Sequence, residues 1–246
     1  MKIEISSALY RFRRRELSGI NRMKQSDGNR MIQSNTNGKE QADRSRRNTM
    51  KERIISQDQF ITAKWEGGET TELFIWPEGS HFQDRAFLFR ISSASFTGTR
   101  SFFSDFSGYQ RYILPIEGEL KLSHKGLYER DLSSHEVEYF DGAWKTHSEN
   151  TPDCRDFNFI YKSGSRALLQ VMKEGDAFLF EGQGILTAYS HKIFSLKAAG
   201  KGIQTVPRGS LYLMEAEDEV TIQILGSETP VILTVFWLGR YYEQSE

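Results

Sequence analysis

The 246-residue chain contains few of the residues that mark disulfide-linked, secreted or membrane proteins. Its one cysteine, Cys154, can form no internal disulfide, which is typical of a reducing compartment. The longest apolar run, "VILTVFWL" (residues 231–238), is far shorter than the roughly 20 residues of a membrane-spanning helix. The first residues, "MKIEISSALYRFRRRE", lack the apolar core of a secretory signal. We therefore expect a cytoplasmic protein with no membrane partner.

Motifs for nucleotide, zinc and hydrolase chemistry are also missing. The sequence has no CxxC pair, no Walker-type loop, no GxGxxG before a helix and no GxSxG elbow. No two of its five histidines stand at HxH or HxxxH spacing; they are His81, His124, His135, His147 and His191. We therefore predict no metal site and no cofactor, and the motifs identify no catalytic residue.

The charge is divided unevenly along the chain. Residues 1–50 hold 12 Lys/Arg and 5 Asp/Glu, a net charge of +7, whereas the remaining 196 residues have a net charge of −8. The first segment is polar and has no sustained apolar period, so it cannot bury enough surface to offset the entropy of ordering. We predict a disordered basic tail over residues 1–50. Its runs "RFRRR" and "RSRR" could contact nucleic acid, but it has no aromatic residue after Phe12 for base stacking, so a solvated tail is favoured.

From residue 51 onward the sequence is typical of an all-β protein. Aromatic residues make up 13% of the chain, and short alternating apolar segments are separated by polar turns. The predicted strands cover residues 71–76, 86–96, 111–116, 119–124, 136–140, 156–162, 167–172, 177–182, 184–189, 192–198, 209–216, 219–225 and 231–238. No long helical period competes with this pattern.

A weak internal repeat divides the β-rich part in two. "YILPIEGELKL" followed by "LSSHEVEYFDG" resembles "ILTAYSHKIFSL" followed by "VPRGSLYLMEAE". This pattern indicates two stacked β-barrel or jelly-roll modules. We predict a first module over residues 51–162 and a second over residues 163–246.

Two strands carry polar residues where apolar ones are expected. In "RDFNFI", Asp156 and Asn158 share one face, and in "FLFRISSAS" Arg90 and Ser92 share one face. If these faces line a barrel lumen, Arg90 needs a partner, and Asp156 is the predicted one. The pair could tie two strands together, or its guanidinium could receive a ligand carboxylate beside the amide of Asn158.

A third segment, "KWEGGETTELFIWPEG", precedes these strands. Gly67 and Gly68 permit a tight turn or a close backbone approach, and Trp65 could then cover one end of the lumen. The same pattern also suits an ordinary turn.

Taken in order, four sequence blocks resemble the HutD/Ves family over about residues 51–240. They are "KWEGGETTELFIWPE", "FRISSASF" with "FFSDFSGYQRYILPIEGELKL", "YFDG" with "DCRDFNFIYKSG", and "VFWLG". The resemblance implies a bicupin, which is two double-stranded β-helix modules in one chain without the metal-binding histidines of other cupins. It also implies a small cytoplasmic bacterial protein, with a proposed regulatory role in histidine utilisation in one branch and a stress response in another. The residues that match the family blocks by position, and that we predict to form a ligand site, are Trp65, Gly67, Gly68, Arg90, Ser92, Asp156 and Asn158.

Two functions of the β-rich part remain open from the sequence, besides association with nucleic acid through the basic tail. The first is binding of a small polar metabolite that carries a carboxylate, in a regulatory role. The second is a metal-independent enzyme, an isomerase or hydrolase, that uses Asp156 or Glu72 as a buried acid or base. The chain could also form a homodimer.

Overall fold

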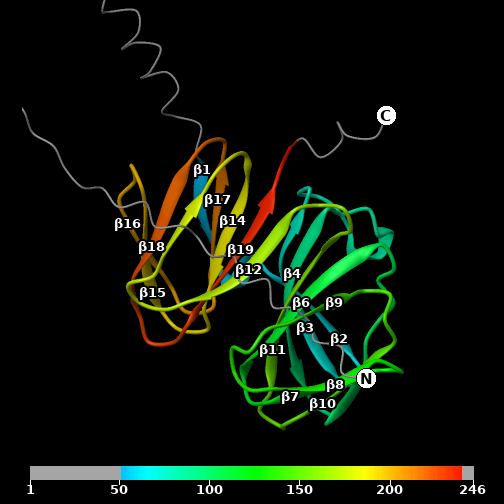
Figure 1. The fold of residues 1–246 in the computed structure, drawn as a ribbon. Coiled ribbons are helices and arrows are strands. Elements are labelled where there is room, and N and C mark those ends of the chain that lie inside the picture. The colour runs from blue at the N-terminus through cyan, green and yellow to red at the C-terminus, as the bar shows by residue number, and fades with distance from the viewer. Residues whose placement is uncertain (1–50, 240–246) are drawn as a thin grey trace, which may run out of the picture. The chain divides into compact units, whose positions relative to one another are not determined.

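The computed structural model describes residues 51–239, which form four antiparallel β-sheets and two short 3-10 segments, η2 (Gln57–Gln59) and η3 (Phe82–Asp84) (Figure 1). The basic tail predicted for residues 1–50, and residues 240–246, lie outside the described residues. Within the described part no α-helix is present, so no helix there is long and apolar enough to cross a membrane. The all-β prediction is confirmed.

Two sheets build the first module. The larger has the order β2-β3-β4-β11-β6-β9 and the smaller has the order β5-β10-β7-β8. The larger consists of β2 (Ile61–Trp65), β3 (Gly68–Trp76), β4 (Phe89–Phe96), β11 (Arg155–Lys162), β6 (Tyr109–Glu117) and β9 (Glu138–Asp141). The smaller consists of β5 (Arg100–Phe102), β10 (Thr146–Asn150), β7 (Leu120–His124) and β8 (Tyr128–Leu132).

The other two sheets build the second module. Their orders are β1-β17-β14-β19-β12 and β13-β18-β15-β16. The first consists of β1 (Lys51–Ile55), β17 (Leu211–Ala216), β14 (Gly184–Tyr189), β19 (Val231–Trp237) and β12 (Ala167–Met172). The second consists of β13 (Ala177–Phe180), β18 (Val220–Ser227), β15 (Phe194–Ala198) and β16 (Ile203–Val206).

The strand β1 is the exception to a simple division along the chain. It pairs with β17, from Lys51 opposite Glu215 to Ile55 opposite Leu211, and in Figure 1 it lies among the strands of the second module. The predicted boundary at residues 162 and 163 falls between β11 and β12, which is where the chain passes from the first pair of sheets to the second. Residues 51–55, by contrast, belong to a sheet of the second module.

Every predicted strand segment overlaps an observed strand. The strands that the sequence pattern missed have five residues or fewer; they are β1, β2, β5, β8, β10 and β16. Several of them carry mostly exposed side chains, such as all of β2 and four of the five residues of β8. A strand without a buried face gives no apolar alternation to detect.

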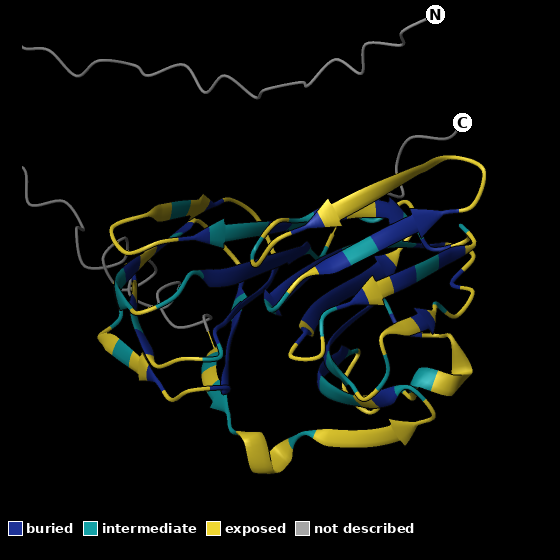
Figure 2. Cartoon of the chain, turned by 90° about the horizontal axis from the view of Figure 1, so that it is seen from below, coloured by how far each residue is buried: buried dark blue, intermediate teal, exposed yellow. Residues whose placement is uncertain are grey.

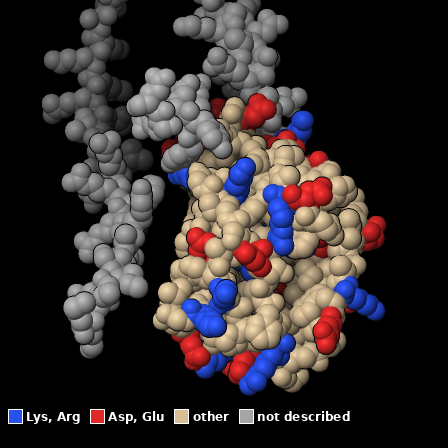
Figure 3. All heavy atoms as spheres, turned by 90° about the vertical axis from the view of Figure 1, so that its right-hand side faces the viewer, with Lys and Arg blue, Asp and Glu red and all other residues tan. Residues whose placement is uncertain are grey.

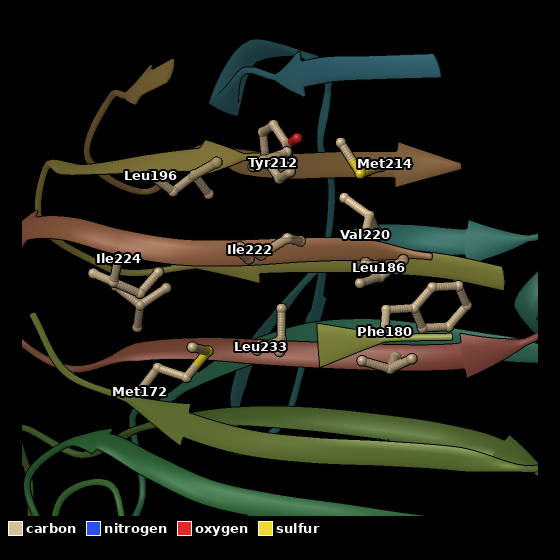
Figure 4. Packing of buried hydrophobic residues seen from close by; sticks show 14 of the residues in the cluster. Met172, Phe180, Leu186, Leu196, Tyr212, Met214, Val220, Ile222, Ile224 and Leu233 are labelled. Carbon is tan, nitrogen blue, oxygen red and sulfur yellow. The ribbon is translucent and has the colours of Figure 1, made fainter. Parts of the chain in front are cut away.

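The interior of the second module is an apolar core. Its two sheets enclose side chains that include Met172, Phe180, Leu186, Leu233 and Tyr212, and Figure 4 shows them pointing into the space between the strands. All five have at most 1% of their surface exposed. Figure 2 shows that buried residues lie on the inner strands, whereas the connections and some strands are exposed. The burial of these side chains stabilises the second module through the hydrophobic effect.

A second apolar layer joins the two modules. Phe89, Phe157 and Phe159 of the first module belong to one buried cluster with Ile232 and Phe236 of the second. The rings of Phe89 and Phe236 lie 4.9 Å apart between centroids, and neither is more than 3% exposed. Because this layer excludes water from both modules, we expect them to unfold together.

We predict that Phe236→Ala lowers the free energy of unfolding by about 3 to 5 kcal/mol, because it leaves a cavity in the shared layer. The matched control is Phe102→Ala, since Phe102 is 89% exposed and should change stability by less than about 0.5 kcal/mol. Chemical denaturation followed by tryptophan fluorescence and circular dichroism measures both. Two separate transitions in the parent protein would contradict the shared layer.

Candidate functional site

A cavity of about 420 Å³ opens inside the first module, and the larger sheet supplies its polar wall. Its polar side chains include Arg90, Ser92, Arg111, Asp156 and Asn158. Its aromatic side chains are Trp65, Phe82, Phe96, Phe102, Phe103 and Phe106. A concave, largely aromatic site with a few converging polar groups is the usual form of a small-molecule site.

Strand alternation places these polar groups together. Strand β11 pairs with β4 on one side and with β6 on the other, so that Ser92 lies opposite Asn158 and Ala94 lies opposite Asp156. The other face of β11 carries Phe157 and Phe159 into the apolar layer between the modules. The predicted faces of β11 and β4 are therefore confirmed.

The predicted partner of Arg90 is wrong. Arg90 Nε donates to Oε2 of Glu72 at 2.7 Å, and Nη1 donates to Ser92 Oγ at 3.0 Å, whereas no ion pair joins Arg90 to Asp156. Strand β4 has β3 on one side and β11 on the other. Side-chain alternation along β4 gives the face on which Arg90 lies, but not which neighbouring strand supplies the carboxylate. Glu72 stands at an irregularity in the β3–β4 register, and such a bulge re-aims a side chain. The Arg90 guanidinium also stacks over the ring of Phe82 at 4.3 Å.

Asp156 is instead held by the backbone of β4. Its Oδ1 accepts a hydrogen bond from the Ala94 N–H at 2.8 Å, and its backbone carbonyl accepts one from Ser93 Oγ at 2.6 Å. Burial raises the pKa of the Asp156 carboxyl to about 7, against the opposing effects of the Ala94 hydrogen bond, Arg111 and Arg90. A buried carboxyl with this pKa changes its charge near neutral pH.

Arg111 also lines the cavity, although the predicted site omitted it. It is only 5% exposed, and its guanidinium lies over the rings of Phe103 and Phe140 at 4.6 and 5.2 Å. Burial lowers the pKa of Arg111 to about 10, and Asp156 is the group that raises it. The family-like block "FSGYQR" contained this arginine, and its two-residue spacing from the buried Ile113 was the signal that it faces inward.

Two buried polar atoms at this site have no hydrogen-bond partner within the described chain. They are Nε of Arg111 and Oδ1 of Asn158. Buried groups of this kind are uncommon in folded proteins because each costs free energy. They lie on the neighbouring strands β6 and β11, so this wall offers one donor and one acceptor that are not used within the described chain.

The three residues from the "KWEGG" segment support the mouth of the cavity. Trp65 lines it, is 40% exposed, and donates from Nε1 to Thr70 Oγ1 at 3.1 Å. Gly67 and Gly68 do not line it. A Cβ on Gly67 would lie 2.1 Å from the Trp65 ring, and a Cβ on Gly68 would lie 2.1 Å from the carbonyl oxygen of Ser95. Both glycines therefore permit the close packing that positions the tryptophan.

The described residues offer no ready metal site. No group of three or more His, Cys, Asp or Glu side chains in residues 51–239 could hold a metal ion. His124, for example, bonds through Nδ1 to Thr146 Oγ1 at 2.8 Å and packs between Phe140 and Trp144. The polar groups that line the cavity are guanidinium, carboxyl, amide and hydroxyl groups.

We predict that Asp156→Asn makes the protein less sensitive to alkaline pH. Because the folded pKa is raised, the carboxyl ionises in the unfolded chain first, and its contribution to stability falls as pH rises from about 4 through about 7. Between pH 5 and pH 8 the variant should gain about 3 kcal/mol relative to the parent protein. Asn can still accept from the Ala94 N–H, so the fold should persist. Urea denaturation at both pH values measures the difference, and a constant difference would contradict the raised pKa.

Comparisons with known proteins agree with this architecture. The HutD family model matches residues 57–231. The structure is similar to HutD from Pseudomonas fluorescens SBW25 (21% identity, TM-score 0.61, covering 77% of this chain and 100% of that one). It is also similar to a conserved protein of unknown function from Pseudomonas aeruginosa PAO1 (23% identity, TM-score 0.67, covering 76% and 98%).

More distantly, the fold matches an oxalate decarboxylase from Lactobacillus farciminis in a formate complex (7% identity, TM-score 0.54, covering 74% and 85%). A comparison with curated proteins found no match. With the family model spanning most of the described residues, and with the cupin arrangement of two β-modules, the chain belongs to the HutD family.

Proposed function

We propose that the first module binds a small metabolite carrying a carboxylate, and that binding serves a regulatory role in histidine utilisation or in a stress response. The regulatory part rests on the resemblance to the HutD/Ves family. The ligand class rests on the charges inside the cavity.

The observation that carries the proposal is an uncompensated guanidinium. Of the two arginines in the cavity wall, Arg90 is neutralised by its ion pair with Glu72. Arg111 faces Asp156, whose carboxyl is largely protonated below pH 7 because burial raises its pKa to about 7. A buried cation without a counter-charge is costly, so a ligand carboxylate beside Arg111 would be strongly favoured.

The other groups limit the size and character of the ligand. A volume of about 420 Å³ suits a molecule of a few to about twenty non-hydrogen atoms. The aromatic walls favour an apolar or planar portion, and the amide of Asn158 can donate and accept hydrogen bonds. An acyl amino acid such as N-formylglutamate has this combination of features. The structure of HutD from Pseudomonas fluorescens SBW25 is of a formate condition, and formate is the smallest carboxylate.

We predict that replacing Arg111 by methionine weakens carboxylate binding about 10- to 100-fold, because a charge-assisted hydrogen bond is lost while most of the side-chain volume is kept. Isothermal titration with formate, N-formylglutamate and its uncharged amide measures this effect. Arg100→Met is the control, since the Arg100 side chain is 75% exposed and paired with Glu149. Equal affinity for the acid and the amide would contradict the proposal.

The affinity should also depend on pH. As pH rises through about 7, Asp156 ionises and repels the ligand carboxylate, so we expect weaker binding at pH 8.5 than at pH 5.5. Asp156→Asn should remove most of this dependence because its side chain stays neutral. Titrations at four pH values on both proteins test this expectation. A parent affinity that rises with pH would show that Asp156 is not the neutral group in the complex.

One observation favours a second function, a metal-independent isomerase or hydrolase. A carboxyl with a pKa of about 7 is suited to general acid–base catalysis at neutral pH. Glu72 is less suited, because it is bonded to Arg90. Turnover of a carboxylate substrate that is abolished by Asp156→Asn, with binding and fold retained, would establish the enzyme. Binding without turnover in the parent protein would favour the regulatory role.

A further inference from the structure

A second cavity, of about 340 Å³, lies at the edge of the apolar layer that joins the two modules. The first module contributes Glu117 and Arg155 to its lining, and the second contributes His191, Lys192 and Arg208. We call this space the junction cavity. It is separate from the candidate site described above, because no residue lines both.

The junction cavity has an excess of positive charge. Three permanent cations, Arg155, Lys192 and Arg208, line it together with the single carboxylate of Glu117. That carboxylate is already shared, since its oxygens lie 3.6 Å from Arg155 Nε and 3.8 Å from His191 Nε2. In the described part of the chain, neither Lys192 nor Arg208 forms an ion pair. Among residues 51–239, these two cations therefore have no counter-ion.

The three cations are close enough to act on one group. Burial lowers the pKa of His191 and Glu117 raises it, and Lys192, Arg155 and Arg208 each lower it further. Coulomb interactions near a protein surface are effective only over short distances, so all three charges lie near the imidazole. The cations therefore line one cavity from both modules.

The backbone that carries Arg208 is fixed in place. Gln57 Nε2 donates to the Arg208 carbonyl oxygen at 2.7 Å, which ties this turn to the segment before β2. The next residue, Gly209, has a φ of 66°, and a Cβ there would lie 2.1 Å from Gln57 Nε2. Only glycine suits both the left-handed backbone and this contact. A fixed turn reduces the entropy that Arg208 would lose on binding a ligand.

The walls between the cations carry hydroxyl groups. Thr62, Thr71 and Ser93 line the junction cavity. Ser93 Oγ already donates to the Asp156 carbonyl, and the Oγ1 atoms of the two threonines lie 2.9 Å apart, so one threonine hydroxyl proton remains for a ligand. Hydroxyls are suitable donors to anionic oxygens. The charge excess also contrasts with the face shown in Figure 3, where basic and acidic side chains are interspersed.

From this arrangement we infer that the junction cavity binds a small anion with at least two negative charges, either a polycarboxylate or a phosphate-bearing metabolite. Because Glu117 offsets Arg155, the side chains of Lys192 and Arg208 leave the lining with an excess of two positive charges, which complements an anion with two negative charges. Because its cations come from both modules, the anion would bridge them.

Titration calorimetry on the full chain tests the inference, with citrate, inorganic pyrophosphate and acetate as probes. Citrate represents the polycarboxylate class, pyrophosphate the phosphate class, and acetate the monovalent control. We expect citrate, pyrophosphate or both to bind at low ionic strength, more tightly than acetate, and more weakly as salt is added. Failure of both citrate and pyrophosphate to bind would overturn the inference.

Variants place the binding in the junction cavity. Lys192→Gln and Arg208→Gln should each weaken binding about 10-fold, in line with the loss of one charge-assisted hydrogen bond. Both side chains are exposed, so the fold should be unaffected. Lys197→Gln, on the exposed side of β15, is the matched control and should change nothing. Arg111→Met should also leave this binding intact, which separates it from the carboxylate proposed for the first module. Equal losses in all four variants would show a general charge effect and contradict the inference.

Discussion

The burial of ionisable groups within one β-module is the constraint from which the properties of the site follow. Arg90, Arg111 and Asp156 are all less than 10% exposed, and desolvation of such charges is costly. The cost of burial is offset differently for each group. Arg90 forms an ion pair with Glu72, whereas Asp156 accepts a backbone hydrogen bond and has its pKa raised to about 7. Arg111 is left with aromatic rings and a carboxyl that is neutral for much of the relevant pH range. A module stabilised only by packing would have no reason to keep this arrangement.

The second module has the same architecture but an apolar interior in place of buried ionisable groups. Its interior contains Phe180, Leu186, Tyr212 and Leu233 where the first module has its cavity, and the apolar layer between them holds both in one folded unit. One module can therefore supply rigidity while the other tolerates unsatisfied polar atoms. This division would suit the site proposed for the first module, because binding sites need rigid supporting elements.

Sequence patterns predicted the strands and the direction of side chains well, because both depend on neighbours along the chain. The alternation in "RDFNFI" was enough to place Asp156 and Asn158 on one face of β11 and Phe157 and Phe159 on the other face. The pairing of Arg90 with Glu72 could not be predicted in this way, since β4 has neighbours on both sides and the choice depends on a register irregularity in β3. The position of β1 beside β17 and the junction cavity depend on contacts between residues more than a hundred positions apart, which no local pattern records.

Strand β11 contributes to both cavities through adjacent residues, with Arg155 in the junction cavity and Asp156 in the first module. Its next residues alternate between the apolar layer and the polar wall in the same way. Inserting or deleting a single residue within β11 would exchange these faces, bringing phenylalanines into the polar wall and Asp156 into the apolar layer. During evolution this strand can therefore accept substitutions but not changes of length, and we expect length variation among relatives to fall in the connections around it.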